Sequence, residues 1–273
     1  RMLNRSDSGT AIIMRYTLRL LTTQQYERAA SLICSCEVLR RREVELLGRT
    51  PISIGLWVGS ASTPNTIESA VHDFNALSRR ATSKNPFVIL KCPWCGAEMG
   101  AVVLKNGMRS RTILKGYRLA KDGRKNRFIY QCDNPDCHFS HGEMPLYVID
   151  EEIYDHRPTL VIGTVDKFAM LPFRPEARSL FGVTESGARM LPPDLIIQDE
   201  LHLISGPLGS MVGSYETLVA ELCSCANGGV KRCPKIVAST ATISRAKAQC
   251  HALYACGTDN VFTTAIGNLC ASF

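Results

Sequence analysis

Leu195-Ile-Ile-Gln-Asp-Glu-Leu-His202 joins a short apolar run to two adjacent carboxylates. An apolar run of this kind is typical of a strand buried on both faces of a parallel sheet. Acidic residues directly after such a strand lie at its carboxyl end, where sheets of this type collect their functional groups. The stretch therefore predicts a parallel α/β fold with a chemically active edge.

The two carboxylates have the arrangement of a Walker B motif. In such a motif the first carboxylate, here Asp199, holds Mg²⁺, usually through water, and the second, here Glu200, deprotonates the water that attacks the γ-phosphate. Apolar strands followed by acids are common, so this pattern is a weak signal until other residues support it.

Hydroxyl residues end two further apolar runs. Thr164 follows residues 160–163, and the hydroxyl residues Ser239, Thr240 and Thr242 follow residues 236–238. A backbone amide and a hydroxyl at a helix start can bind phosphate, and hydroxyls at a neighbouring strand end can bond to the acidic pair. Taken singly, each of these residues is better explained as a helix N-cap.

The rest of the chain alternates apolar runs with helical patterns. Such alternation predicts a doubly wound, mostly parallel sheet. Thr22 with Gln25 forms a capping-box pattern, which predicts that the first long helix starts at Thr22. The expected strands are 11–14, 52–58, 87–90, 146–149, 160–163, 195–197 and 236–238, and the expected helices are 22–47 and 65–80.

Two pairs of cysteines have the spacing of metal ligands. Cys92 and Cys95 form a C-x₂-C pair, and Cys132 and Cys137 form a C-x₄-C pair. Four thiolates make a closed tetrahedral Zn²⁺ site, which is structural because it leaves no coordination position open. His138 and His141 are substitute ligands if one cysteine is not used. A redox C-x-x-C pair and plain buried thiols remain alternatives.

The positive charge of the chain is concentrated between the cysteine pairs. The whole chain carries a net charge of +7, and residues 91–131 hold ten basic against two acidic residues. Clustered charge of one sign indicates a polyanionic partner, although a solvated basic hairpin is the alternative. The basic loop 105–127 is therefore expected to lie along a phosphate backbone through Arg109, Arg111, Lys115 and Arg118.

The composition excludes several classes of protein. The chain has 273 residues, 45% hydrophobic, with ordinary Gly (20) and Pro (13) counts, which excludes disordered and collagen-like sequences. No apolar run approaches the length of a membrane span, and the polar start differs from a secretory signal. A cytoplasmic protein is expected.

Together, in this order and spacing, the motifs resemble the first motor domain of superfamily-two helicases. Asp199–His202 matches the DExH motif, and 240–242 matches the Ser/Thr-Ala-Thr motif. Within that superfamily, residues 15–25, the cysteine segment, 164–169 and 194–206 most resemble the DrmA family, the helicase-like components of DISARM phage-defence systems. The resemblance covers about residues 9 to 257.

The resemblance implies a RecA-like sheet, an ATP-dependent helicase or translocase activity and roles for individual residues. Asp199 would bind Mg²⁺, Glu200 would be the general base, and His202, Thr240 and Thr242 would couple hydrolysis to strand movement. The residues expected to contact the nucleic-acid backbone are Arg15, Arg19, Thr164 and Lys167. The implied cofactors are ATP, Mg²⁺ and Zn²⁺, and the implied partners are nucleic acid, DNA rather than RNA, and proteins of a defence complex.

The sequence departs from the family pattern in one serious respect. It contains no G-x-x-x-x-G-K-[ST] phosphate loop. The expected organisation is a motor lobe that begins after its phosphate loop, without the second lobe and inactive as an ATPase by itself. A non-catalytic zinc-containing adaptor that binds nucleic acid or protein is the alternative. The expected parts are 1–90 and 142–257 for the lobe, 91–141 for a zinc-binding insert, and 258–273 for an atypical tail.

Overall fold

A computed structural model shows the fold of the chain. It describes residues 8–79, 85–106, 109–123, 125–184, 187, 189–227, 230–240 and 246–254. None of the helices in these ranges is both long and apolar enough to cross a membrane.

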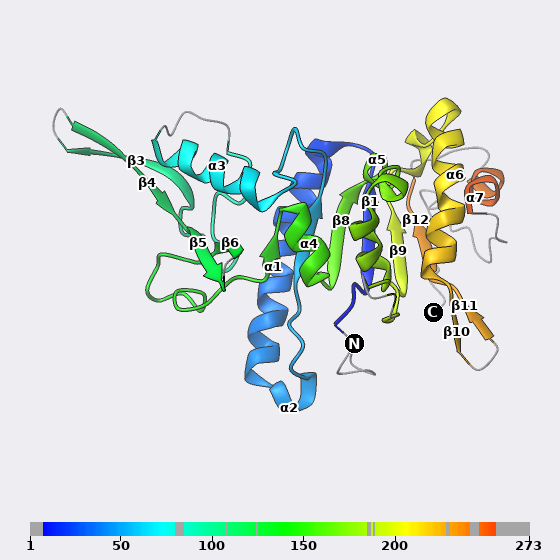
Figure 1. Ribbon diagram of the computed structural model, residues 1–273, viewed down its shortest axis with the longest axis horizontal. Coiled ribbons are helices and arrows are strands. Elements are labelled where there is room, and N and C mark those ends of the chain that lie inside the picture. Colours follow the sequence, from blue (N-terminus) through cyan, green and yellow to red (C-terminus); the bar gives the residue numbers. More distant parts are fainter. Residues whose placement is uncertain are drawn as a thin grey trace, which may run out of the picture.

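A six-stranded sheet forms the centre of the molecule (Figure 1). Its strands run in the order β12-β9-β1-β8-β2-β7, and all neighbouring pairs are parallel, which confirms the predicted α/β class. The strands of this sheet are β1 (Ile12–Tyr16), β2 (Ile54–Trp57), β7 (Leu146–Tyr147), β8 (Leu160–Thr164), β9 (Leu195–Gln198) and β12 (Lys235–Ala238).

Each face of the sheet has its own apolar core. Successive side chains of a strand point to opposite faces, so Ile13 packs into one core and Tyr16 into the other. The long helix α1 (Arg19–Arg42) packs on the Tyr16 face. The opposite face is covered by α4 (Asp150–His156), α5 (Val165–Phe168), η1 (Leu171–Phe173), η2 (Pro175–Phe181), η3 (Leu201–Leu203), α6 (Gly206–Cys223) and α7 (Ala246–Tyr254).

The β12 side of the sheet is less covered than its centre. In the part of the chain that the structure describes, β12 pairs with β9 alone. Val237 of β12 is 43% exposed, whereas the central strands β1 and β8 are mostly buried. Among the described residues, β12 is therefore the less buried edge of the sheet.

Two antiparallel hairpins form most of the segment 91–141. They are β3 (Gly100–Asn106) with β4 (Arg109–Lys115), and β5 (Tyr117–Asp122) with β6 (Lys125–Tyr130). The β3–β4 hairpin extends away from the sheet (Figure 1). Helix α3 (Ile67–Arg79) contacts β4 and β6, and Phe87 stacks on Phe128 of β6 with ring centroids 4.0 Å apart. The segment therefore shares the core of the α1 face.

Three sequence expectations about individual elements are wrong. The long helix begins at Arg19 instead of Thr22, since Thr22 lies in its first turn and both its N–H and its hydroxyl donate to the Leu18 carbonyl. The helix ends at Arg42, and a separate turn, α2 (Val44–Leu47), follows. Residues 87–90 form no strand, because Val88 adopts a positive φ of 65° and Ile89 N–H bonds to the Phe87 carbonyl.

The last two strands form a short hairpin after α6. They are β10 (Cys225–Asn227) and β11 (Val230–Arg232), and they pair antiparallel.

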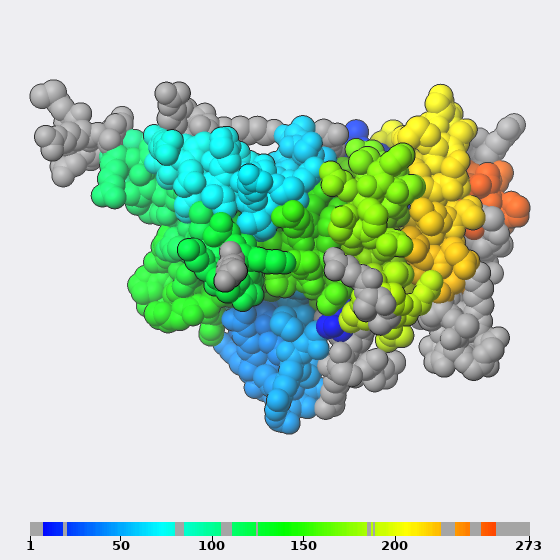
Figure 2. Space-filling model, in the orientation of Figure 1, coloured from blue at the N-terminus to red at the C-terminus, as the bar shows by residue number. Residues whose placement is uncertain are grey.

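Helix α2 and the C-terminal end of α1 protrude from the body of the molecule. In the space-filling view they form the blue lobe (Figure 2).

Candidate functional site

The acidic pair lies where three parallel strands end together. Asp199 N–H donates to the Arg15 carbonyl of β1 at 2.9 Å, and Ser239 N–H donates to the Gln198 carbonyl at 2.9 Å. Leu201 N–H returns a bond to the Ser239 carbonyl at 2.9 Å. The backbone that carries the two carboxylates is therefore fixed on both sides, by β1 and by β12.

Glu200 sits in a conformation that side chains of its kind rarely adopt. Its φ of 52° and ψ of 44° lie in the left-handed region, which costs a non-glycine residue about 1 kcal/mol. This residue turns the chain from β9 into η3 and brings its carboxylate to 3.3 Å from Nδ1 of His202. Both side chains are half-buried, so they remain accessible to a ligand.

Two hydrogen bonds hold the Asp199 carboxylate. Its Oδ1 accepts bonds from the Ser239 hydroxyl and, at 2.9 Å, from the Glu200 N–H. Tyr16 lies nearby at the end of β1, where burial and the negative charge of Asp199 raise its pKa to about 12. The phenol stays neutral at all physiological pH values, so it adds no negative charge beside Asp199.

Sequence reasoning missed Tyr16, but its expectation that a hydroxyl of the 238–242 stretch bonds to the acidic pair is met by Ser239. Ser239 makes the contact with Asp199, whereas Thr240 is exposed and Thr242 lies outside the described residues. Tyr16 follows Met14 by two residues and ends β1, the strand that pairs with β9. This pairing brings Tyr16 to the acidic pair, and it cannot be inferred from the sequence.

The basic residues expected to contact nucleic acid need a correction. Arg15 is fully buried, pairs through Nη1 with Glu216 of α6, and lies over the ring of Phe168 with Cζ 5.2 Å from its centroid. Lys167 is buried as well and donates from Nζ to Asp150 at 2.6 Å. Charged residues are usually exposed, but here ion pairs with acidic residues on neighbouring helices stabilise both of them in the interior.

The structure says less about Thr164 and Arg19, the two other residues expected to contact the nucleic-acid backbone. Thr164 is fully buried at the end of β8, and its hydroxyl finds no hydrogen-bond partner among the described residues. Arg19 begins α1, and its side chain lies outside the described part of the chain. In this structure none of the described side chains of this set is presented at the surface.

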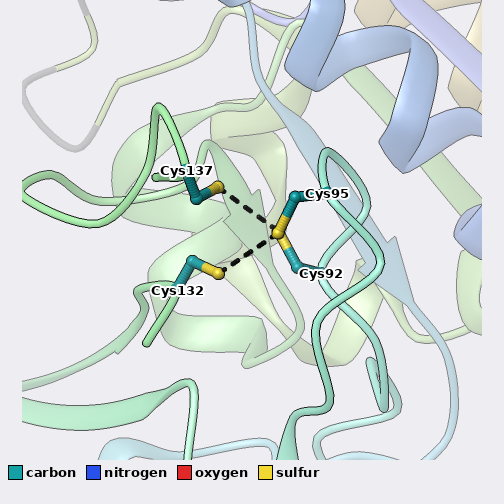
Figure 3. A group of neighbouring side chains, drawn as sticks. All are labelled: Cys92, Cys95, Cys132 and Cys137. Carbon is teal, nitrogen blue, oxygen red and sulfur yellow. Dashed lines mark hydrogen bonds between the residues drawn. The ribbon is translucent and has the colours of Figure 1, made fainter. Parts of the chain in front are cut away.

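The four cysteines meet between the loop before β3 and the loop after β6 (Figure 3). Their four Sγ atoms all lie within 4.8 Å of one another, with 3.8 Å between Cys92 and Cys137 and 3.5 Å between Cys95 and Cys132. Zn–S bonds of about 2.3 Å in a tetrahedron require S–S separations of about 3.8 Å. The cluster therefore has the size of a tetrahedral thiolate site and could hold a metal ion.

Backbone and amide N–H groups point at these sulfurs. Asn134 N–H lies 3.4 Å from Sγ of Cys132, and Phe139 N–H lies 3.5 Å from Sγ of Cys137. Burial raises the pKa of Cys132 and Cys137, the latter to about 11, whereas at Cys95 burial is outweighed by bonds from the Ala97 N–H, Cys132 and Asn134, which lower the pKa to about 7. Such donors favour the thiolate form that binds metals. His138 and His141 are not part of the cluster, so the four cysteines suffice as ligands.

Ion pairs neutralise part of the basic segment. Arg118 pairs with Asp133, Lys115 Nζ lies 3.8 Å from Glu98, and Arg127 Nη2 lies 3.0 Å from Glu143. Arg111 is exposed on β4, while the side chain of Arg109 lies outside the described residues. The expected phosphate-binding face is thus less uniformly basic than the sequence suggested.

Comparison with known proteins identifies a relative for this chain. Over 274 aligned positions, which cover 89% of the chain, it is 35% identical to the DISARM protein DrmA of Bacillus paralicheniformis. The chain is a relative of DrmA. The resemblance indicated by the sequence motifs is therefore confirmed.

The chain spans 23% of the length of that DrmA. No family model matches it. Among solved structures, the DUF1998 helicase MrfA, bound to DNA and AMPPNP, aligns with 91% of this chain and 24% of its own, at 14% identity and a TM-score of 0.33. A TM-score this low does not establish a common fold, so the relation to DrmA rests on the sequence identity alone.

Proposed function

We propose that this chain is the part of a DrmA-type helicase-like defence protein that carries the hydrolytic carboxylates of an ATP-driven DNA motor. The observation that carries the proposal is the acidic pair at the carboxyl edge of β9, fixed by β1 and β12. Asp199 would hold Mg²⁺ through water, and Glu200 would act as general base toward the attacking water. His202, 3.3 Å from Glu200, would link that carboxylate to the bound strand.

The site needs a phosphate-binding loop from elsewhere. The sequence contains no G-x-x-x-x-G-K-[ST] motif, and the DrmA relative is much longer than this chain. We place the missing strand and loop at the edge of β12, where Val237 is exposed and Ser239 already contacts Asp199. ATP and Mg²⁺ would bind only when this segment is present, so the isolated chain is expected to be inactive as an ATPase.

The four-cysteine cluster would hold zinc in a structural role. All four positions of a tetrahedral site are filled by thiolates, which leaves none for a substrate. A redox pair needs only two sulfurs, whereas here four converge, and those of Cys132 and Cys137 accept backbone N–H bonds. We assign residues 91–141 to a zinc-binding insert in a lobe formed by 1–90 and 142–257. The expected tail, 258–273, lies outside the described residues.

DNA would contact the insert and the start of α1. Arg109 and Arg111 on the extended hairpin are the main candidates, and Lys115 and Arg118 contribute less because acidic neighbours already pair with them. Arg19 remains the candidate at the sheet edge. Arg15 and Lys167 would instead hold the strand ends in place through Glu216 and Asp150.

A second candidate function is a non-catalytic zinc-containing adaptor. The absence of a phosphate loop from the sequence and the inward orientation of Arg15 and Lys167 favour it. The left-handed conformation of Glu200 favours the motor, because strained residues persist mainly at functional sites.

One experiment separates the two. A full-length DrmA-type protein that contains this segment is assayed for DNA-stimulated ATP hydrolysis, with Glu200→Gln compared against Glu27→Gln, an exposed acid on α1. The motor proposal predicts a loss of about 10²–10⁴-fold with Glu200→Gln and no change with Glu27→Gln. Equal activity in both variants would leave only the adaptor. Mg²⁺-dependent hydrolysis by the isolated chain, abolished by Glu200→Gln, would show that no further segment is needed.

A further inference from the structure

Three exposed side chains form a row where the cysteine loops meet the end of α1. The rings of Trp94 and His138 lie edge to face, with centroids 5.0 Å apart and planes at 78°. Nη2 of Arg42, the last residue of α1, lies 3.0 Å from Nε2 of His138. The row thus presents an indole, an imidazole and a guanidinium side by side at the surface.

Contacts beneath the row fix it to both cysteine loops. Ser31 of α1 donates from its hydroxyl to the Pro93 carbonyl at 2.9 Å, and Arg41 lies over the ring of Phe139 with Cζ 5.3 Å from its centroid. Trp94 lies between Cys92 and Cys95, and His138 directly follows Cys137. A metal in the four-cysteine cluster would therefore also hold Trp94 and His138 in place.

The exposure of Trp94 sets it apart from the other tryptophan of the chain. Trp57 is fully buried and donates from Nε1 to Tyr154, whereas Trp94 is 36% exposed on a turn. An exposed indole offers a flat apolar face, and unpaired bases stack on such faces whatever their sequence. A guanidinium carries five N–H donors, of which the contact of Arg42 with His138 uses one, and this fork matches phosphate oxygens.

Charge decides between a nucleic acid and a protein as the ligand. Tryptophan and arginine are also common in protein interfaces. The segment 91–131, which contains Trp94, holds ten basic against two acidic residues, and the last turn of α1 adds Arg40, Arg41 and Arg42 beside the row, against Asp133 and Asp136 in the loop that carries His138. This imbalance favours a polyanion.

We propose that Trp94, His138 and Arg42 form a binding site for single-stranded nucleic acid. An unpaired base stacks on the Trp94 indole, and the adjacent phosphate binds Arg42. The proposal rests on the nucleic-acid function inferred above and deepens it, since it places an unpaired strand on the cysteine loops, separate from the Arg109 and Arg111 hairpin.

Tryptophan fluorescence tests the proposal directly, because the chain has only two tryptophans and one is buried. The zinc-loaded chain is titrated at low salt with a thymidine oligonucleotide of roughly 12 residues. Binding is expected to change the tryptophan emission, and the change is expected to vanish in Trp94→Phe, which retains a stacking ring. Trp94→Ala is expected to weaken binding at least about fivefold, and Arg42→Ala to weaken binding and its salt dependence. Arg28→Ala, an equal charge change at an exposed position of α1, is the control.

Three outcomes would overturn the proposal. If the oligonucleotide binds without an emission change and Trp94→Ala binds equally well, the row is not the site, although the nucleic-acid function stands. If neither the oligonucleotide nor duplex DNA binds, that function fails too. Should Trp94→Ala lose its metal, as cobalt–thiolate absorption would show, Arg42→Ala and Trp94→Phe decide instead. Capture of a protein by this row, with no binding of the oligonucleotide, would make it a protein interface.

Discussion

The four-cysteine cluster takes its ligands from two loops of one segment, whereas the acidic edge is assembled from β1, β9 and β12. In the cluster all four sulfurs are present and the surrounding N–H groups already point at them. At the acidic edge the carboxylates are fixed, but in the described part of the chain β12 is paired on one side only, and the sequence has no phosphate loop. A structural site can be complete within a segment, while a catalytic site of this kind depends on strands far apart in the chain.

The largest expected effect comes from breaking the self-contained site. Cys132→Ser removes one of four ligands, so the chain is expected to lose its metal and several kcal/mol of folding free energy. Cys92, Cys132 and Cys137 are part of the same core as Tyr26 and Ile54, so the loss should reach the α1 face of the sheet. Metal content and thermal unfolding measure both effects. Cys36→Ser, outside the cluster, is the control, and an equal loss there would contradict the account.

The second prediction concerns the support of the acidic edge. Glu216→Gln leaves the buried guanidinium of Arg15 without its carboxylate, which is expected to cost about 3–5 kcal/mol of unfolding free energy. Urea unfolding measures it, with the exposed Glu27→Gln as the control. A loss below about 1 kcal/mol would mean that Arg15 is not held by this pair, and its role as a nucleic-acid contact would return.

The third prediction uses the junction of the insert with the sheet. Glu152 of α4 is buried and accepts the Phe128 N–H of β6 at 2.9 Å. Burial raises its pKa from 4.5 to about 7, against the opposing effects of that bond and of Arg127, while Glu143 and Asp155 add to the rise. A carboxyl whose pKa is higher in the folded state stabilises the fold most at low pH, and this stabilisation is lost as the pH rises from about 4.5 to 7.

Glu152→Gln keeps an acceptor for Phe128 N–H and cannot ionise. Between about pH 5 and pH 7.5 the unfolding free energy of this variant should therefore fall less than that of the unchanged chain. The difference between the two decreases is expected to be about 1–3 kcal/mol. Denaturant unfolding at the two pH values gives the comparison, and metal effects cancel because both proteins hold the same cysteines. Identical pH dependence would show that Glu152 does not titrate at this junction.

The smallest expected effect is a change in the salt dependence of DNA binding. It should differ between an exposed and an ion-paired arginine of the hairpins. Arg111→Ala is expected to lower the slope of log affinity for DNA against log salt by about one, as loss of one phosphate contact does. Arg118→Ala should change the slope less, because Arg118 is paired with Asp133. Binding titrations at several salt concentrations test this. A larger effect of Arg118 would mean that the pair opens on DNA.

The sequence predicted local features well and long-range ones poorly. The cysteine spacings led directly to the cluster, because its ligands lie within two short loops. The apolar run before Asp199 led to β9, which lies between β12 and β1 in a parallel sheet. The ion pairs of Arg15 and Lys167 were not predictable, because their partners, Glu216 and Asp150, become neighbours only through the strand order. The contact of Ser239 with Asp199 depends on the same register.

The acidic edge is the central claim, and a structure of a full-length DrmA-type protein with Mg²⁺ and a non-hydrolysable ATP analogue tests it most directly. The account predicts the metal beside the carboxylate that corresponds to Asp199, the γ-phosphate facing Glu200, and an additional strand paired with β12. A nucleotide bound elsewhere, with the acidic pair facing no phosphate and β12 still at the edge of the sheet, would contradict it.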